Sequence, residues 1–136
     1  CSAELSTAQI RDLKKPLPCG VFAYGRLPLM VSENCLRRNE LGCTGRCKLP
    51  ATLTDRTGEE FLILAERGCR NLIVNGKVLY FADRKEELVR AGASFLYLYF
   101  TDESRDTCAQ VLRDYERGDG KKPEQLTRGL LTRGVL

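Results

Sequence analysis

The sequence predicts an α+β fold with mixed or antiparallel strands and two or three helices, and three observations support this class. The chain has 136 residues, of which 43% are hydrophobic and 29% charged, as in one ordinary globular domain with its own core. Short apolar runs bounded by turn residues recur through its middle, which is typical of hairpins of antiparallel strands. Segments with helix signals lie before and after these runs, so helices and strands are both expected.

The N-terminal part predicts a short helix followed by a buried strand. Ser6 and Gln9 form a capping-box pattern, and Ile10 and Leu13 lie on the side of this helix that faces the core. The apolar run from Cys19 to Tyr24 (CGVFAY) predicts the strand, which the following Gly-Arg-Leu-Pro sequence interrupts.

Two hairpins are expected in the middle of the chain. The first joins 51–54 to 59–64 through Asp55-Arg56-Thr57-Gly58, so Asp55 and Arg56 are interpreted first as turn residues. The second joins 72–74 to 77–81 through Asn75-Gly76, which is the strongest short hairpin signal.

The C-terminal half predicts two helices with a strand between them. Asp83 with Glu86 predicts a cap for the first helix, which ends near residue 92, and 95–100 predicts the strand. Thr101, with acidic residues in the first turn, predicts the start of the second helix. Its apolar positions follow a helical period and are Cys108, Val111, Leu112 and Tyr115. A polar linker then leads into a basic tail from residue 118.

Four cysteines form the most informative pattern in the chain. Cys35, Cys43, Cys47 and Cys69 follow the spacing C-x7-C-x3-C-x21-C, and the first three lie in an irregular loop over 32–50. Several thiolates on a glycine-containing loop and one from a distant anchor suit a metal centre. The spacing alone leaves zinc and an iron–sulfur cluster open, and it also leaves open small buried residues or disulfides. Cys108 and Cys19 are interpreted as core residues, and the terminal Cys1 is uninformative.

The amino-acid composition excludes several classes of functional site. The chain has no histidine, which excludes a Ser-His-Asp or Cys-His catalytic unit and a histidine-containing zinc site made from these residues. The net charge of +4 permits contact with phosphate or an acidic substrate. No apolar run spans a bilayer and no secretory signal opens the sequence, so no membrane partner is expected.

Several polar residues near the cysteines are candidates for binding a substrate. Arg26 offers a planar fork to a carboxylate or phosphate, and Asn71 is placed to hydrogen-bond the cysteine loop. The full set of weaker substrate-binding candidates is Tyr24, Arg26, Asp55, Arg56, Asn71, Arg128 and Arg133. The catalytic residues stay unassigned.

These residues resemble the collagenase-like peptidase family. The resemblance rests on the run from Tyr24 to Met30, on the cysteines, on 53–61, on Gly68-Cys69-Arg70-Asn71 and on the closing Thr127-Arg128-Gly129. It implies the C-terminal part of a longer bacterial protein that contains a (β/α) barrel. The three implied segments are 1–50 with the last barrel-type elements and the cysteine loop, 51–117 as an α+β segment, and 118–136 as a basic tail.

The same resemblance implies a function. Members are identified as peptidases, and relatives take part in the hydroxylation of RNA or of ubiquinone precursors. Some relatives bind a four-iron four-sulfur cluster through four cysteines, which favours a [4Fe–4S] cluster over zinc. We therefore expect a cytoplasmic, cluster-bearing region of a protein that acts in proteolysis or RNA hydroxylation. Its expected partners are the rest of the parent barrel, an RNA or peptide substrate, and further copies of the isolated chain. The alternative is a non-catalytic module, stapled by its metal, that binds RNA or a protein.

Overall fold

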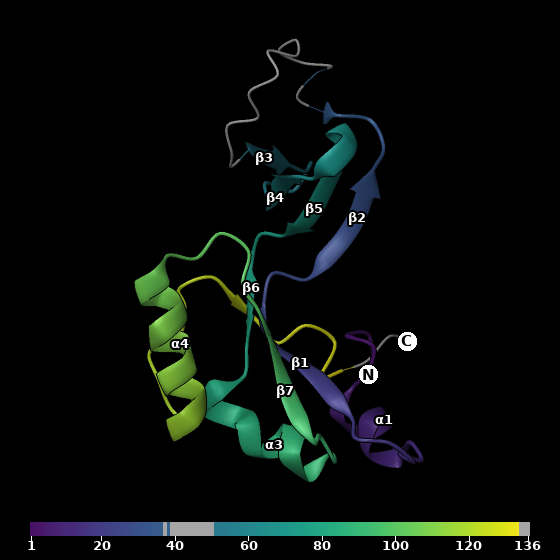
Figure 1. Ribbon diagram of the computed structural model, residues 1–136, viewed down its shortest axis with the longest axis vertical. Helices are drawn as coiled ribbons and strands as arrows, with labels where there is room; N and C mark the ends of the chain where they lie inside the picture. The colour runs from purple at the N-terminus through teal and green to yellow at the C-terminus, as the bar shows by residue number, and fades with distance from the viewer. Residues whose placement is uncertain (37, 39–50, 134–136) are drawn as a thin grey trace. The chain divides into compact units, whose positions relative to one another are not determined.

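The computed structural model describes residues 1–36, 38 and 51–133, and it divides into two compact units (Figure 1). Unit 1 comprises Cys1–Arg26 and Lys77–Leu136, and unit 2 comprises Leu27–Gly76. Both units contain a four-stranded sheet, and three α-helices lie within the described part of unit 1. The predicted α+β class with mixed and antiparallel strands is therefore confirmed. The sequence segments divided at residues 50 and 117 follow chain order, and they stay a prediction about the parent protein.

The sheet of unit 1 has the strand order β7-β1-β6-β8. Strand β1 (Gly20–Gly25) pairs in parallel with β7 (Phe95–Tyr99) and antiparallel with β6 (Val78–Tyr80). The short β8 (Leu126–Thr127) runs parallel to β6. The C-terminal segment is thus part of the sheet.

Three helices and two 3-10 turns complete the described part of the chain. The helices are α1 (Thr7–Asp12), α3 (Lys85–Arg90) and α4 (Arg105–Arg117). The turns are η1 (Arg67–Cys69) in unit 2 and η2 (Ala82–Arg84) in unit 1. Within the described residues, no helix combines the length and the apolar character that crossing a membrane requires.

The first helix has the predicted cap. The Ser6 side chain accepts a hydrogen bond from the Gln9 amide, and the Gln9 side chain accepts one from the Ser6 amide. Ile10 is fully buried, as predicted. Leu13, which was expected beside it, is 46% exposed because the helix ends at Asp12 and turns Leu13 away from the core.

A cluster of three tyrosines forms the centre of unit 1. Tyr24 of β1, Tyr80 of β6 and Tyr115 of α4 are almost wholly buried, and their ring centroids lie 6.0 to 6.5 Å apart. The Tyr115 hydroxyl donates to the carbonyl of Ala23 at 2.6 Å and accepts from the amide of Phe81 at 2.7 Å. Through this one hydroxyl, helix α4 is fixed to strand β1 and to the residue that follows β6.

Unit 2 is an antiparallel sheet in the order β2-β5-β4-β3. Its strands are β2 (Pro28–Ser32), β3 (Ala51–Thr54), β4 (Glu60–Ala65) and β5 (Asn71–Asn75). Strands β3 and β4 form the first predicted hairpin, which is confirmed. The Gly-Arg-Leu-Pro sequence ends β1 as predicted, and its proline opens β2. Leu62, Leu72 and Val74 form the small core of this unit.

The second predicted hairpin is wrong. Strand β5 pairs with β2 and β4 in unit 2, whereas β6 pairs with β1 and β8 in unit 1. A type I′ turn requires positive φ at both central residues, and neither Asn75 nor Gly76 is among the described residues with positive φ. A Cβ atom on Gly76 would collide with the carbonyl oxygen of Glu60. Glycine is needed at position 76 because the backbone at Glu60 approaches closely. The Asn-Gly sequence therefore reflects this close approach and does not mark a hairpin turn.

Two predicted helix starts are also corrected. Helix α4 begins at Arg105 with Ser104 as its cap, because the Ser104 hydroxyl accepts from the Thr107 amide. Thr101 therefore precedes the helix. Asp83 lies in η2 and does not cap α3, since its carboxylate binds Arg128 instead. Along α4 itself, Val111 and Tyr115 are buried as predicted, but Leu112 is half exposed.

Candidate functional site

One end of the unit 2 sheet gathers the described cysteines of the four-cysteine pattern. Ser32, the last residue of β2, pairs with Asn71, the first residue of β5. Cys35 follows Ser32 by three residues, and Cys69 precedes Asn71 by two. Both thiols therefore belong to the same end of the sheet.

The strand that follows the cysteine loop begins near this end as well. Ala51 opens β3 opposite Ile63, and Ala65 at the end of β4 pairs with Asn71. The chain thus leaves the sheet after β2 and re-enters it toward the end that carries Cys69. Cys43 and Cys47 belong to the intervening segment and lie outside the described residues.

Asn71 holds the start of the cysteine segment against the sheet. Its side chain is only 3% exposed, and its Oδ1 accepts a hydrogen bond of 2.7 Å from the amide of Leu36. The side-chain amide donates to the carbonyl of Arg70 at 3.1 Å. The residue after Cys35 is therefore tied to the first residue of β5, which is the role the sequence predicted for Asn71.

Cys69 has an unusual backbone conformation. Its φ is +61°, the only positive value for a non-glycine residue in the described part of the chain, and the preceding Gly68 has φ of +78°. A left-handed conformation costs a residue with a Cβ roughly 1–2 kcal/mol. Such local strain is concentrated at binding and catalytic positions. The turn presents Cys69 at an exposed position, and neither Cys69 nor Cys35 forms a disulfide.

The donor set fits a thiophilic metal as far as it is described. Two free thiols at one end of a sheet, one of them on a strained exposed turn, suit zinc or an iron–sulfur cluster. Within residues 1–36, 38 and 51–133, no three histidine, cysteine, aspartate or glutamate side chains converge as a metal site. That range contains only two of the four predicted ligands.

Asp55 and Arg56 lie away from the cysteines. The hairpin turn that contains them follows Thr54, which pairs with Glu60 at the opposite end of the strands. The Asp55 carboxylate accepts three hydrogen bonds, from the amide and hydroxyl of Thr57 and from the amide of Glu59. The bond from Thr57 is the largest cause that lowers the pKa of Asp55. These hydrogen bonds make Asp55 a turn-forming residue, as predicted, and both Asp55 and Arg56 are exposed.

Tyr24 and Arg26 lie at the carboxyl edge of the parallel pair in unit 1. Because β1 and β7 run in the same direction, the residues that follow them meet at one edge, the edge at which open α/β sheets bind ligands. The Arg26 Nε lies 3.4 Å from the Asp102 carboxylate. Tyr24 itself is 3% exposed and belongs to the core.

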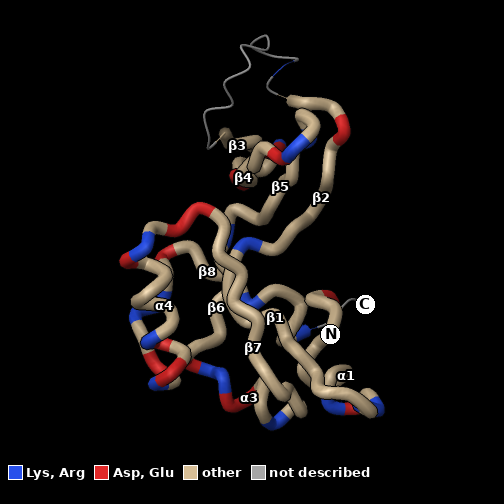
Figure 2. Tube along the Cα trace, in the orientation of Figure 1, with Lys and Arg blue, Asp and Glu red and all other residues tan. Residues whose placement is uncertain are grey.

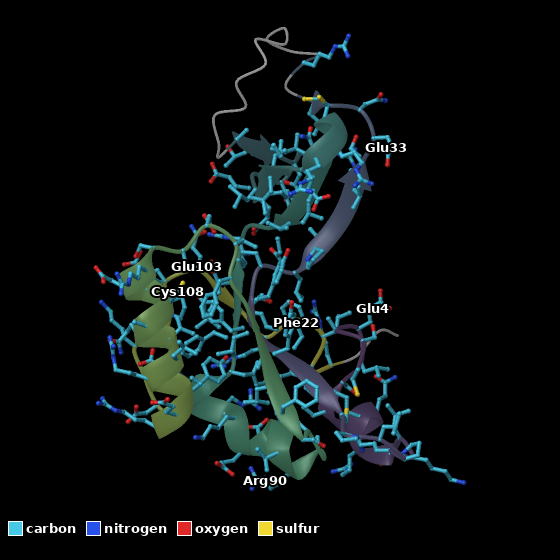
Figure 3. All side chains as sticks on the ribbon, viewed as in Figure 1. Glu4, Phe22, Glu33, Arg90, Glu103 and Cys108 are labelled. Atoms are coloured by element: carbon cyan, nitrogen blue, oxygen red, sulfur yellow. The ribbon has the colours of Figure 1, made fainter. Side chains whose placement is uncertain are left out.

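Glu103 is a polar residue at this edge that the sequence predicted only as part of a helix. Its Oε2 accepts from the amides of Thr101 and Asp102, and its Oε1 is buried with no hydrogen-bond partner among the described atoms. Burial, followed by the charge of Glu103, raises the pKa of Tyr24 above its ordinary value. Figure 3 shows Glu103 and Cys108 close together where β7 gives way to α4.

Arg128 belongs to an internal ion pair. It donates to the Asp83 oxygens at 2.8 and 2.9 Å and to the carbonyl of Tyr80, and its guanidinium lies 5.2 Å from the centre of the Phe81 ring. Arg133 is exposed near the end of the described chain. Arg128 is therefore largely buried in an ion pair, whereas Arg133 is exposed to solvent. Nothing in the sequence near Arg128 indicated that Asp83 would be its partner.

Comparison of the chain with protein-family models, with curated proteins and with solved structures found no match. The chain's own residues are therefore the basis for assigning its function.

Proposed function

We propose that unit 2 holds a metal centre through Cys35, Cys43, Cys47 and Cys69. The observation that carries this proposal is the strand topology of unit 2. Cys35 and Cys69 share one end of the sheet, and the segment that contains the other two cysteines begins and ends toward it. Four thiolates from one loop and one anchor turn complete the donor set of a structural zinc site or an iron–sulfur cluster.

We favour a [4Fe–4S] cluster and keep zinc as the alternative. The resemblance to the collagenase-like peptidase family favours the cluster, which supplies one-electron redox chemistry when bound. The residues beside the proposed ligands would position the chain around the centre. Asn71 fixes the chain beside Cys35, and the positive φ of Cys69 sets the direction in which its thiol leaves the turn.

We further propose that the chain is the C-terminal part of a longer, cytoplasmic barrel protein that acts in proteolysis or RNA hydroxylation. Parallel strands normally occur in sheets that are covered on both faces. In β7, however, Phe95 is 57% and Tyr97 49% exposed, and these residues lie on one face of the parallel pair. The exposed aromatic face supports the proposal that another part of the parent protein covers it, and we propose the rest of the barrel for this role. The same face favours self-association of the isolated chain.

The metal is tested by anaerobic purification of the chain followed by absorption spectroscopy and analysis of iron, sulfide and zinc. The expected result is a broad absorption band at ~400 nm with about four irons per chain. Cys35→Ser and Cys69→Ser should each lower the bound metal strongly. Cys108→Ser is the matched control, because Cys108 lies on α4 in unit 1, and it should retain the metal.

The other outcomes separate the alternatives. One zinc per chain without colour would assign the site to a structural staple rather than a cluster. Absence of both metals from the anaerobic protein, or equal loss in Cys108→Ser and Cys35→Ser, would contradict the four-cysteine site.

A further inference from the structure

A groove of about 250 Å³ lies between helices α1 and α3 in unit 1. Its walls come from both helices and are formed by Thr7, Ala8, Arg11, Glu87, Arg90 and Ala91. The two alanines leave space between the longer side chains. The volume is below the roughly 300–1,000 Å³ of pockets that bury drug-sized ligands, so the groove suits a single small chemical group.

The two arginines of the groove have little internal compensation. Among the described residues, the Arg11 side chain pairs only with its neighbour Asp12, at 3.6 Å, and both side chains are more than 60% exposed. A surface pair of this kind contributes little, about 0–1 kcal/mol. The side chain of Arg90 makes no hydrogen bond or ion pair with another residue in the described chain. Figure 2 shows basic residues on α1 and at the end of α3, and Figure 3 labels Arg90 there.

The one carboxylate of the groove is already satisfied. Glu87 accepts from the Nε and a terminal nitrogen of Arg84, each at 2.6 Å, so both of its oxygens are bound. The Arg84 bonds are the largest cause that lowers the pKa of Glu87, and Arg90 contributes further. Both Glu87 oxygens are thus occupied by Arg84, and the guanidinium of Arg90 interacts with Glu87 only through its charge, so its hydrogen-bond donors stay available.

We propose that this groove binds a phosphate group. A guanidinium fork fits an oxyanion with two parallel hydrogen bonds, and two such groups on neighbouring helices suit a group with several anionic oxygens. The hydroxyl of Thr7 adds a neutral donor at the groove wall. The phosphate belongs either to a small phosphate ester or to the backbone of an RNA strand, and the two sources share the chemistry described here.

The test is an NMR titration of the whole chain with inorganic phosphate at constant ionic strength. Chemical-shift changes should concentrate on the amides of α1 and α3. Arg90→Gln and Arg11→Gln should each raise the Kd at least five-fold, whereas Arg105→Gln should change it less than two-fold. Arg105 is the control because it is an exposed arginine at the start of α4, outside the groove.

A second variant tests the same site by a gain of binding. Asp12→Asn removes the only ion-pair partner of Arg11 among the described residues and should tighten phosphate binding. Equal weakening by all three arginine variants would reveal a mere net-charge effect and overturn the proposal. Shifts that spread evenly over the chain would also overturn it.

Single-stranded oligouridylate distinguishes the two phosphate sources. If the source is RNA, the oligonucleotide binds more tightly than inorganic phosphate. Arg90→Gln then makes the slope of log affinity against log salt shallower by roughly 0.7 for each RNA phosphate that Arg90 neutralises. If the oligonucleotide binds no more tightly than phosphate, the groove serves a small phosphate ester.

Discussion

Arg128 ties the C-terminal segment of unit 1 to the turn that follows β6. It donates two charge-assisted hydrogen bonds to Asp83 and a third to the carbonyl of Tyr80, and both charged side chains are about four-fifths buried, with exposures of 18% and 20%. Each bond to a charged group contributes about 1.5–3 kcal/mol. The bonds are not additive, and Lys122 at 3.1 Å still pairs with Asp83 when Arg128 is removed. Arg128→Met should therefore lower the free energy of unfolding by about 3 kcal/mol.

This loss can be measured for unit 1 by itself. The chain has five tyrosines and no tryptophan, and all five tyrosines belong to unit 1, so tyrosine fluorescence in urea follows that unit. Asp83→Asn and the double variant complete a cycle whose coupling energy should be about 1.5–2 kcal/mol. A loss below about 1 kcal/mol, or a coupling energy near zero, would refute the assignment of this pair as a stabilising contact.

The same pair has a defined pH dependence. Hydrogen bonding to Arg128 is the largest cause that lowers the pKa of Asp83, from 3.8 to about 2. A carboxyl whose folded pKa is lowered stabilises the protein above its unfolded pKa and loses that contribution as pH falls through the folded value. The difference in stability between the parent chain and Asp83→Asn should be nearly constant above about pH 5 and should shrink as pH falls from about 5 through the folded pKa of about 2.

Three further predictions concern the core of unit 1 and two glycines, Gly25 in unit 1 and Gly58 in the hairpin turn of unit 2. Tyr115→Phe leaves the carbonyl of Ala23 and the amide of Phe81 buried without their shared partner, and urea unfolding should show a loss of about 2–4 kcal/mol; a loss below about 1 kcal/mol would contradict this. Gly25→Ala should destabilise unit 1 by at least about 3 kcal/mol, because φ is +121° and the new Cβ would collide with the backbone of β7 at Tyr99. Gly58→Ala, in an open turn, should lower the free energy of unfolding by only about 1–2 kcal/mol. Equal losses in the two variants would exclude the steric explanation. Burial raises the pKa of all three clustered tyrosines, to about 12 for the β6 member. Folding therefore holds these three tyrosines neutral as pH passes 10. Ultraviolet absorption should show the three clustered tyrosines largely unionised at about pH 11 until the chain unfolds, and their ionisation in the folded chain would contradict this prediction.

The sequence predicted those features that a few neighbouring residues determine. The cap formed by Ser6 and Gln9 and the turn built by Asp55 use hydrogen bonds that span two to four residues, so their signals lie within one short window. The role of Asn71 was also predictable, because it lies two residues after a cysteine of the pattern.

Features that join distant segments were not predictable from one sequence. Asp83 was interpreted as a helix cap because its partner Arg128 is 45 residues away. The Asn75-Gly76 pair has the composition of a hairpin turn, but pairing of the flanking strands with two different sheets overrides that local preference. Contacts between residues far apart in the sequence leave no periodic pattern and no fixed residue spacing from which they could be predicted.

Unit 2 is inserted between two paired strands of unit 1, and this arrangement bears on folding kinetics. Gly25 at the end of β1 pairs with Leu79 of β6, and the whole segment 26–78 connects them. Closing a flexible loop of that length costs about 2 kcal/mol more than closing a loop of a few residues. If unit 2 folds first, its own pairing of Pro28 with Val74 brings the two connections together and shortens the effective loop. If the proposed metal centre forms and stabilises unit 2, it should then accelerate the formation of unit 1 as well, because all four proposed ligands belong to unit 2.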